Sequence, residues 1–152
     1  LKTPLHPTID RLIAKLEKHP EVFDPAVNPY AVRVVITGSR PDPSAFGEFP
    51  HFISFDGFID VEYTPEQLER VALISEPFCR YAKWKGGPEP LPAQEKQVIE
   101  QLIAKSHKAG KPIRFWCSPD NAVAWETFRK LGIDIINTDQ PEACTLYFQQ
   151  NP

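Results

Sequence analysis

The segment 113–139 constrains the fold of this chain more than any other part of the sequence. Residues 113–117 combine β-branched and aromatic side chains between turn formers, which is typical of a buried strand. A second apolar strand is predicted at 133–137. The residues between them show helical spacing and then a terminating glycine: Trp125, Phe128, Leu131 and Gly132. A strand, a helix and a strand of this combined length predict one parallel crossover unit.

The same alternation of strands and helices continues through the rest of the chain. Further strands are predicted at 32–37, 52–55 and 71–75, with the first of these buried on both faces. Helices are predicted at 7–16, from Thr64, at 92–109 and from Asp139, with loops at 20–30, after 38 and at 78–87. Such alternation implies a parallel sheet, and two architectures fit it. One is a small doubly wound sheet, and the other is the second part of a (βα)8 barrel.

Composition narrows the classes of protein to which this chain can belong. Its 152 residues are 41% hydrophobic, which is enough for the core of one domain. A net charge of −3, with no basic run, argues against nonspecific binding of nucleic acid. No apolar run approaches the roughly 18 residues of a membrane span. The compartment stays open between cell envelope or periplasm and cytoplasm.

The cysteines and the absence of methionine add two further expectations. Cys79, Cys117 and Cys144 are an odd set with long, irregular spacing. This spacing fits neither a zinc-ligand pattern nor a disulfide framework, so we interpret all three as buried free thiols. Because the chain begins at Leu1 and has no methionine, we expect that an upstream segment has been removed.

The residues of the last two predicted strands resemble a known family. Segments 113–121 and 132–139 are similar to the end of the phosphatidylinositol-phospholipase-C-like phosphodiesterases, and closest to their glycerophosphodiester phosphodiesterase-like branch. That family typically has a tryptophan on the seventh strand, here Trp116, and an (I/N)-T-D tripeptide closing the eighth, here 137–139. Shorter similarities occur upstream in the same order, at 34–38, 40–41, 55–57, 73–75 and 83–84.

The resemblance implies the C-terminal part, strands four to eight, of a (βα)8 TIM barrel with a parallel sheet. Residues 1–152 would form a single partial domain, and Lys2 would follow the third strand. In the family, the catalytic histidines and the carboxylates that bind a divalent cation, Ca²⁺ or Mg²⁺, lie on the first three strands. The histidines here match none of those positions: His6, His19, His51 and His107. No catalytic or metal-binding residue is therefore implied within this span.

Candidate substrate-binding residues lie on strands, after strands or in the loops that follow them: Lys2, Arg40, Asp56, Lys83, Trp84, Arg114, Trp116 and Asp139. By the resemblance, Lys2 would face the substrate phosphate, although a solvated terminal lysine is the alternative. Trp116 would form an apolar wall of the pocket, or else belong to the core. Arg114 shares the strand parity of Trp116, so it would also point into the barrel. A buried arginine there would require either the anionic substrate or a structural acidic partner.

The remaining candidates each have a structural alternative as well. Asp56 and Asp139 follow strands, where site residues of parallel sheets lie, but Asp139 could instead cap the last helix. Arg40, Lys83 and Trp84 could form a cationic and aromatic rim for a phosphate ester, although each alone could be a surface residue. Ser75 and Asn121 are weaker candidates.

Three functional hypotheses follow. In the first, the complete domain is a hydrolase of phosphodiesters such as the glycerophosphodiesters of lipid metabolism, and this span supplies pocket walls. The second is a non-catalytic barrel relative that binds a small anionic or sugar-like ligand. The third is a half-barrel completed by self-association through its edge strands at 32–37 and 133–137. The expected partners are a small phosphodiester or polyol-phosphate ligand and either the upstream half of the barrel or a second copy.

Overall fold

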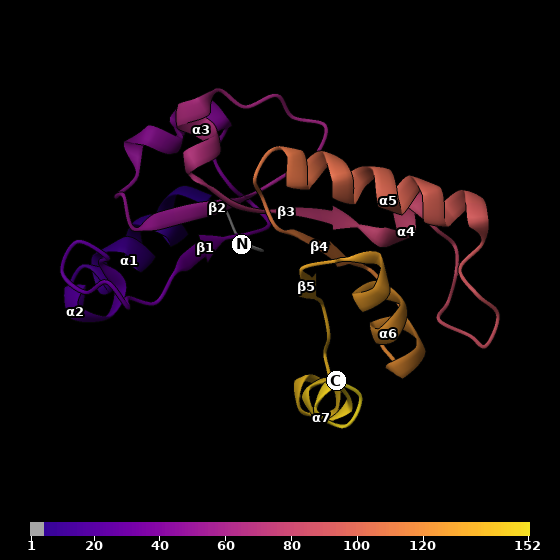
Figure 1. Cartoon of the computed structure of the whole chain (residues 1–152). Coiled ribbons are helices and arrows are strands. Elements are labelled where there is room, and N and C mark those ends of the chain that lie inside the picture. The colour runs from indigo at the N-terminus through magenta and orange to yellow at the C-terminus, as the bar shows by residue number, and fades with distance from the viewer. Residues whose placement is uncertain (1–4) are drawn as a thin grey trace. The chain divides into compact units, whose positions relative to one another are not determined.

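The computed structural model describes residues 5–152, with side chains from Pro7 onward, and shows an α/β fold (Figure 1). The strands are β1 (Val34–Ile36), β2 (Ile53–Gly57), β3 (Val71–Pro77), β4 (Ile113–Trp116) and β5 (Ile135–Ile136). The longer helices are α1 (Leu5–Leu16), α5 (Ala93–Lys108), α6 (Ala122–Leu131) and α7 (Pro141–Gln150). The shorter ones are α2 (Pro20–Phe23), η1 (Pro43–Glu48), α3 (Pro65–Glu69) and α4 (Phe78–Tyr81).

The strands form one sheet in the order β1-β2-β3-β4-β5, so each strand lies beside its successor in the chain and the predicted parallel sheet is confirmed. The pairs β1–β2, β3–β4 and β4–β5 are parallel. The first strand is shorter than predicted, and its expected burial on both faces is wrong, because Val34 and Val35 are only half-buried. Helical turns also occupy positions predicted as loops, at α2 and α4. In the described part of the chain, no helix has the length and apolar character needed to cross a bilayer.

The chain divides into two compact units, and the first contains the residues up to Gly57 and Val61–Ala72. Its core is aromatic: the ring of Phe46 stacks on that of Phe55 with centroids 4.2 Å apart, and Phe49 meets Phe55 edge-on. The helix predicted from Thr64 is confirmed as α3, and it begins with a capping box in which the Thr64 hydroxyl accepts from the Gln67 N–H. Aromatic packing beside β2 therefore defines this unit's interior.

Arg70 ties the end of α3 to the segment that leads into β2. Its Nη2 donates to the carbonyl oxygens of Pro50 at 2.8 Å, Ile53 at 2.9 Å and Phe49 at 3.2 Å. Its Nε also donates to Ile53 O at 3.3 Å. Burial lowers the pKa of Arg70 from its ordinary value, but an arginine remains charged at any physiological pH. The guanidinium thus satisfies three backbone acceptors of one turn.

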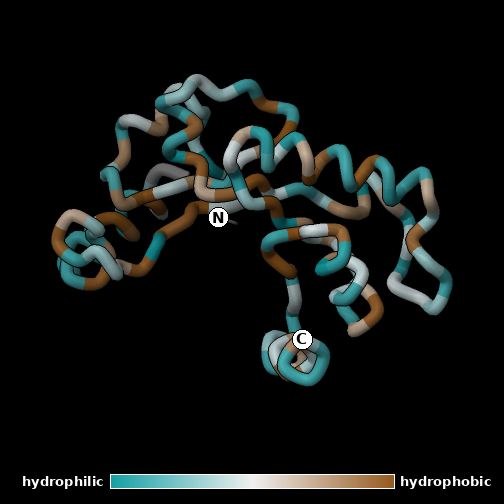
Figure 2. Tube along the Cα trace, viewed as in Figure 1, coloured by the Kyte–Doolittle hydropathy of each residue, from teal (hydrophilic) through white to brown (hydrophobic). Residues whose placement is uncertain are grey.

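The second unit contains Phe58–Asp60 and Leu73–Pro152. Helix α5 packs against β4, and α6 packs against β5 and α7 (Figure 1). On α5, Ile99 and Ile103 are buried, whereas Val98 is 38% exposed. The tube of α5 accordingly alternates between hydrophilic and hydrophobic residues (Figure 2). This pattern is expected of a helix with one face on a sheet.

Local sequence signals determine where α6 begins and ends. The Asn121 Oδ1 accepts a hydrogen bond from the Ala124 N–H at 3.0 Å and caps the first turn. Gly132 has a φ of 81° and ends the helix in the left-handed conformation that glycine adopts without steric cost. Asn121 therefore caps α6, and the terminating glycine predicted at Gly132 is confirmed.

Candidate functional site

The second unit places Arg114 beside Ser75 on neighbouring parallel strands. The two residues are in register, and the Arg114 guanidinium donates to the Ser75 hydroxyl from Nη2 at 2.8 Å and from Nε at 3.3 Å. Ser75 is 1% exposed and Arg114 is half-buried. Within the described residues Arg114 forms no ion pair, so the acidic protein partner considered for it is not found there. The guanidinium instead donates its hydrogen bonds to a neutral hydroxyl.

Trp116 lies two residues beyond Arg114, at the carboxyl end of β4. Successive residues of a strand alternate between faces, so the two side chains lie on the same side of β4. Trp116 is 43% exposed, which excludes the alternative of a core tryptophan. Its register partner is Pro77, the last residue of β3. An exposed indole therefore stands next to a half-buried guanidinium on one face of the β3–β4 pair.

Lys83 and Trp84 lie in the loop between α4 and α5. Lys83 is exposed, whereas Trp84 is half-buried and meets the ring of Phe128 edge-on. The indole N–H of Trp84 donates to the Glu89 carbonyl oxygen at 2.8 Å. Trp84 also lines a cavity of about 160 Å³ that includes Lys85 and Ser118. Lys83 and Trp84 were both predicted as rim residues, and of these two only Trp84 lines the cavity.

Arg40 and Asp56 lie in the first unit and bind each other. Arg40 Nη1 lies 2.8 Å from Asp56 Oδ1, and the two side chains are 12% and 7% exposed. Both were predicted as substrate-binding residues, and the structure joins them in a largely buried ion pair. Asp56 lies within β2 and not after it, so its predicted position beyond the strand is wrong. Lys2, the remaining candidate near the start of the chain, lies outside the described residues.

The helix-cap alternative for Asp139 is wrong. Helix α7 begins at Pro141, and its N-cap residue is Gln140, which makes no side-chain capping hydrogen bond. Asp139 is exposed, and its backbone N–H donates to Asp120 Oδ2 at 2.8 Å. The Asp120 Oδ1 accepts from the indole N–H of Trp125 at 2.7 Å. Asp120, which was not a candidate, therefore organises the loop that carries Asp139.

These hydrogen bonds give the stability of the loop a predictable pH dependence. Burial alone would raise the pKa of Asp120, but the hydrogen bonds from Asp139, Thr138, Trp125 and Gln140 outweigh it and lower the pKa. A carboxylate with a lowered pKa stabilises the fold above its unfolded pKa, about 3.9, and loses that contribution as the pH falls through the folded pKa. We expect Asp120→Asn to destabilise at pH 7, and the difference from wild type to shrink below about pH 4. Urea unfolding at several pH values measures this, and a difference independent of pH would contradict it.

Glu76 is a buried carboxylate that the sequence analysis missed. It is 1% exposed; its Oε1 accepts from the Ile59 N–H and its Oε2 from the Tyr81 hydroxyl, both at 2.8 Å. Burial, and then the hydrogen bond to Glu76, raise the pKa of Tyr81 to about 12. An acidic residue near the end of the apolar strand 71–77 was the available signal. The register places Glu76 opposite Phe115, so its side chain is on the other face of β3 from Ser75.

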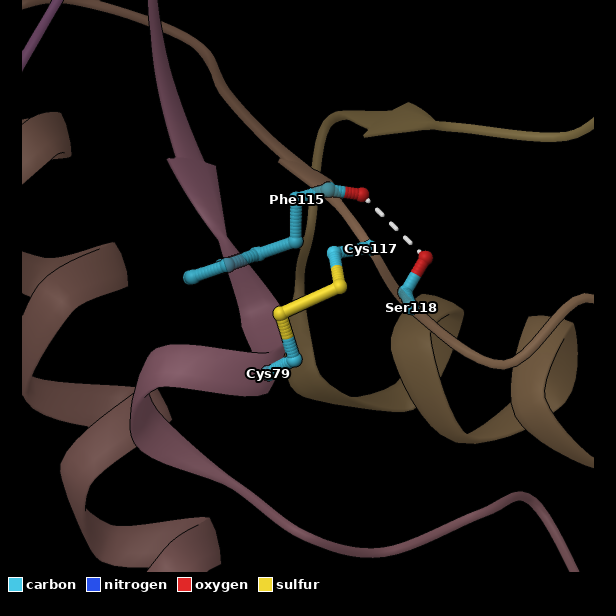
Figure 3. The surroundings of a disulfide bond; sticks show 4 residues. All are labelled: Cys79, Phe115, Cys117 and Ser118. Atoms are coloured by element: carbon cyan, nitrogen blue, oxygen red, sulfur yellow. Dashed lines mark hydrogen bonds between the residues drawn. A yellow bond between two sulfur atoms is a disulfide. The ribbon is translucent and has the colours of Figure 1, made fainter.

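The expectation of three free thiols is wrong for two of them. Cys79 and Cys117 form a disulfide with Cα atoms 5.7 Å apart, and both residues are exposed (Figure 3). Cys79 follows β3 and Cys117 follows β4, so the bond joins the carboxyl ends of adjacent parallel strands. Only this adjacency brings together cysteines that are 38 residues apart in sequence. Cys144 is free and buried, as predicted.

Histidines and carboxylates do not converge on a metal site in the described part of the chain. No group of three or more His, Cys, Asp or Glu side chains there could hold a metal ion. His51 and His107 each pair with a single carboxylate at 2.8 Å, Asp24 and Asp134 respectively. The described residues therefore do not provide a site for the divalent cation that the resemblance implies.

The second unit thus has a cationic and aromatic face on β4 and a disulfide between strand ends, and the first unit has a largely buried ion pair. Comparison with known proteins found no family model, no curated protein and no solved structure that matches this chain.

Proposed function

We propose that this chain supplies the substrate-binding part of a phosphoric diester hydrolase-like barrel domain. The observation that carries the proposal is Arg114, a half-buried guanidinium whose partner in the described part of the chain is the neutral Ser75 hydroxyl. A cation that has lost part of its water shell gains from an anionic partner, because desolvation of an unpaired charge is costly. A bound anion would complete this arrangement.

The geometry of Arg114 favours a phosphodiester among possible anions. A guanidinium has five N–H donors, and two of them point at Ser75, so the remaining donors are available to a ligand. Paired N–H groups suit the two unesterified oxygens of a phosphodiester, which carries a single negative charge. The exposed indole of Trp116 on the same face offers an apolar surface to the alcohol part.

By the resemblance, the catalytic groups would lie in the complete domain, upstream of this chain. In the family, upstream histidines and a divalent cation would supply the acid–base and Lewis-acid chemistry at phosphorus. In our proposal this chain binds and orients the diester, and Arg114 offsets negative charge that builds on the phosphoryl oxygens.

We expect Arg114→Gln to weaken binding of a glycerophosphodiester by at least about tenfold, because a charge-assisted hydrogen bond is lost. Titration with glycerophosphocholine, followed by two-dimensional ¹⁵N NMR, gives the dissociation constant. The matched control is Arg129→Gln, since Arg129 is an exposed arginine that pairs with Glu126 on the surface of α6. Equal affinity in wild type and Arg114→Gln, with the fold intact, would reject the proposed role of Arg114.

Turnover separates the hydrolase hypothesis from a non-catalytic binder. We expect the 152-residue chain alone to release no p-nitrophenolate from bis(p-nitrophenyl) phosphate with Ca²⁺ or Mg²⁺, because its histidines match no catalytic position of the family. A chain that also contains the family's first three barrel strands is expected to show metal-dependent release. Turnover by the short chain would contradict the assignment of the catalytic groups to the first three strands. Binding without turnover by the longer chain would favour a non-catalytic binding protein.

A further inference from the structure

The Cys79–Cys117 disulfide crosslinks the two loops that follow β3 and β4. Cys79 lies in α4, just before the loop 82–87, and Cys117 begins the loop 117–121 (Figure 3). Both cysteines are exposed. Structural disulfides of stable domains resist reduction, whereas exposed ones are more often the labile kind. Because both cysteines are exposed and lie just after the ends of strands, the disulfide is accessible to an external thiol.

A cavity beside the disulfide provides the approach. Both cysteines line the cavity of about 160 Å³, together with Lys85, Trp84 and Ser118. The ammonium group of Lys85 would favour a thiolate in this cavity, whether the attacking sulfur or the departing one. The Ser118 hydroxyl is engaged elsewhere, because it donates to the Phe115 carbonyl oxygen at 3.2 Å (Figure 3).

The backbone around the bond is held in a closely packed conformation. Cys117 has a φ of 55° and is the one non-glycine residue with positive φ in the part of the chain that the structure describes. This conformation is disfavoured for a residue with a Cβ atom. On the facing loop, a Cβ added to Gly86 would lie 2.8 Å from both Pro119 and Asn121 side-chain atoms. The two loops are therefore in close contact, and the disulfide attaches to a residue, Cys117, whose backbone conformation is disfavoured.

We propose that the Cys79–Cys117 disulfide is a reversible redox switch that exchanges with a dithiol reductant. A thiolate of the dithiol attacks one sulfur, the S–S bond breaks, and the other cysteine leaves as a thiolate that takes up a proton. The second thiol of the reductant then attacks the mixed disulfide and releases the first cysteine. Two electrons pass to the protein, both cysteines become thiols, and the dithiol becomes a disulfide.

Reduction is expected to loosen the end of β4, where the anion-binding face lies. Cys117 directly follows Trp116, and Arg114 is two residues further back on the same strand. Release of Cys117 frees the loop 117–121 from the loop 82–87 and lets Trp116 move. The reduced protein should therefore bind the phosphodiester more weakly. This last consequence rests on the proposed function, whereas the exchange reaction and the loosening do not.

Hydrogen–deuterium exchange on oxidised and reduced protein tests the switch. In the Cys144→Ala background, millimolar dithiothreitol without denaturant should expose two thiols per chain, and reoxidation should remove them. Reduction should accelerate exchange in 82–87 and 117–121 by roughly tenfold or more, while the helix 93–108 stays unchanged. Cys79→Ser/Cys117→Ser should reproduce the reduced pattern in the absence of reductant. A bond that yields to dithiothreitol only in denaturant, or that is reduced without change in these loops, would overturn the proposal.

Two further experiments test the role of Lys85 and the coupling of the disulfide to ligand binding separately. Lys85→Gln should slow reduction by roughly three- to tenfold, while Lys108→Gln, the same charge change at the end of α5, should not. Equal rates in both variants would reject the role of Lys85 in the switch. Glycerophosphocholine titrations of oxidised and reduced protein then address coupling. Failure of the oxidised form to bind contradicts the proposed function alone, whereas equal binding by both forms contradicts the coupling alone.

Discussion

Replacement of Glu76 by alanine is expected to lower the free energy of unfolding by about 3–4 kcal/mol. The substitution removes the carboxylate that accepts hydrogen bonds from the Ile59 N–H and the Tyr81 hydroxyl. Glu76 is 1% exposed, so water does not readily take the place of the lost carboxylate oxygens. The buried Ile59 N–H left without a partner costs about 1–3 kcal/mol, the half-buried Tyr81 hydroxyl loses a charged acceptor, and the removed side-chain carbons add a cavity. Urea denaturation followed by far-ultraviolet circular dichroism measures the change.

Two variants keep this prediction testable if Glu76→Ala does not fold. Glu76→Gln retains an oxygen for Ile59 and an amide N–H₂ for the Tyr81 oxygen, so we expect a loss of only about 1 kcal/mol. Tyr81→Phe removes one donor and leaves the carboxylate bound to Ile59, again at a cost of about 1 kcal/mol. A loss below 1 kcal/mol for Glu76→Ala would show that the carboxylate does not hold these two segments.

Arg70→Ala is expected to cost about 3 kcal/mol of unfolding free energy, because three backbone carbonyls lose a charged donor. Arg70→Lys should recover only part of this, since one ammonium cannot reproduce the planar fork that reaches Phe49, Pro50 and Ile53 together. Thermal and urea unfolding measure both changes. The matched control is Arg33→Ala, an exposed arginine of the same unit, whose effect should stay within about 0.5 kcal/mol. Equal losses for Arg70→Ala and Arg33→Ala would contradict the prediction.

Hydrophobic patterning was sufficient to predict most of the fold. The terminating Gly132 of α6 and the helix start at Thr64 follow from signals within a few neighbouring residues, and the parallel sheet follows from the alternation of strands and helices. Strand ends were less accurate: β5 covers two residues where five were predicted, because pairing with β4 and not local composition sets its length. The turns α2 and α4 are too short for helical periodicity to reveal them.

The candidate site was harder to predict because its partners depend on register. Strand parity placed Arg114 and Trp116 on one face, but nothing local indicated that Ser75 would be the partner of Arg114. Ion pairing of Arg40 with Asp56 likewise required knowledge of the fold over 16 residues of separation. The Cys79–Cys117 bond escaped prediction for the same reason, since spacing rules for cysteines do not include parallel strands with a helix between them.

That bond also determines how the second unit would respond to force. With the sulfurs joined, tension applied to the chain passes from the end of β3 to the end of β4 and bypasses α5, which lies within the covalent loop. A single peptide-bond cleavage inside the loop would leave the molecule in one piece. After reduction, unfolding under force can extend the 38-residue separation between the cysteines, which is about 130 Å of extra contour length. The redox state of two sulfur atoms thus sets the mechanical length of this polypeptide.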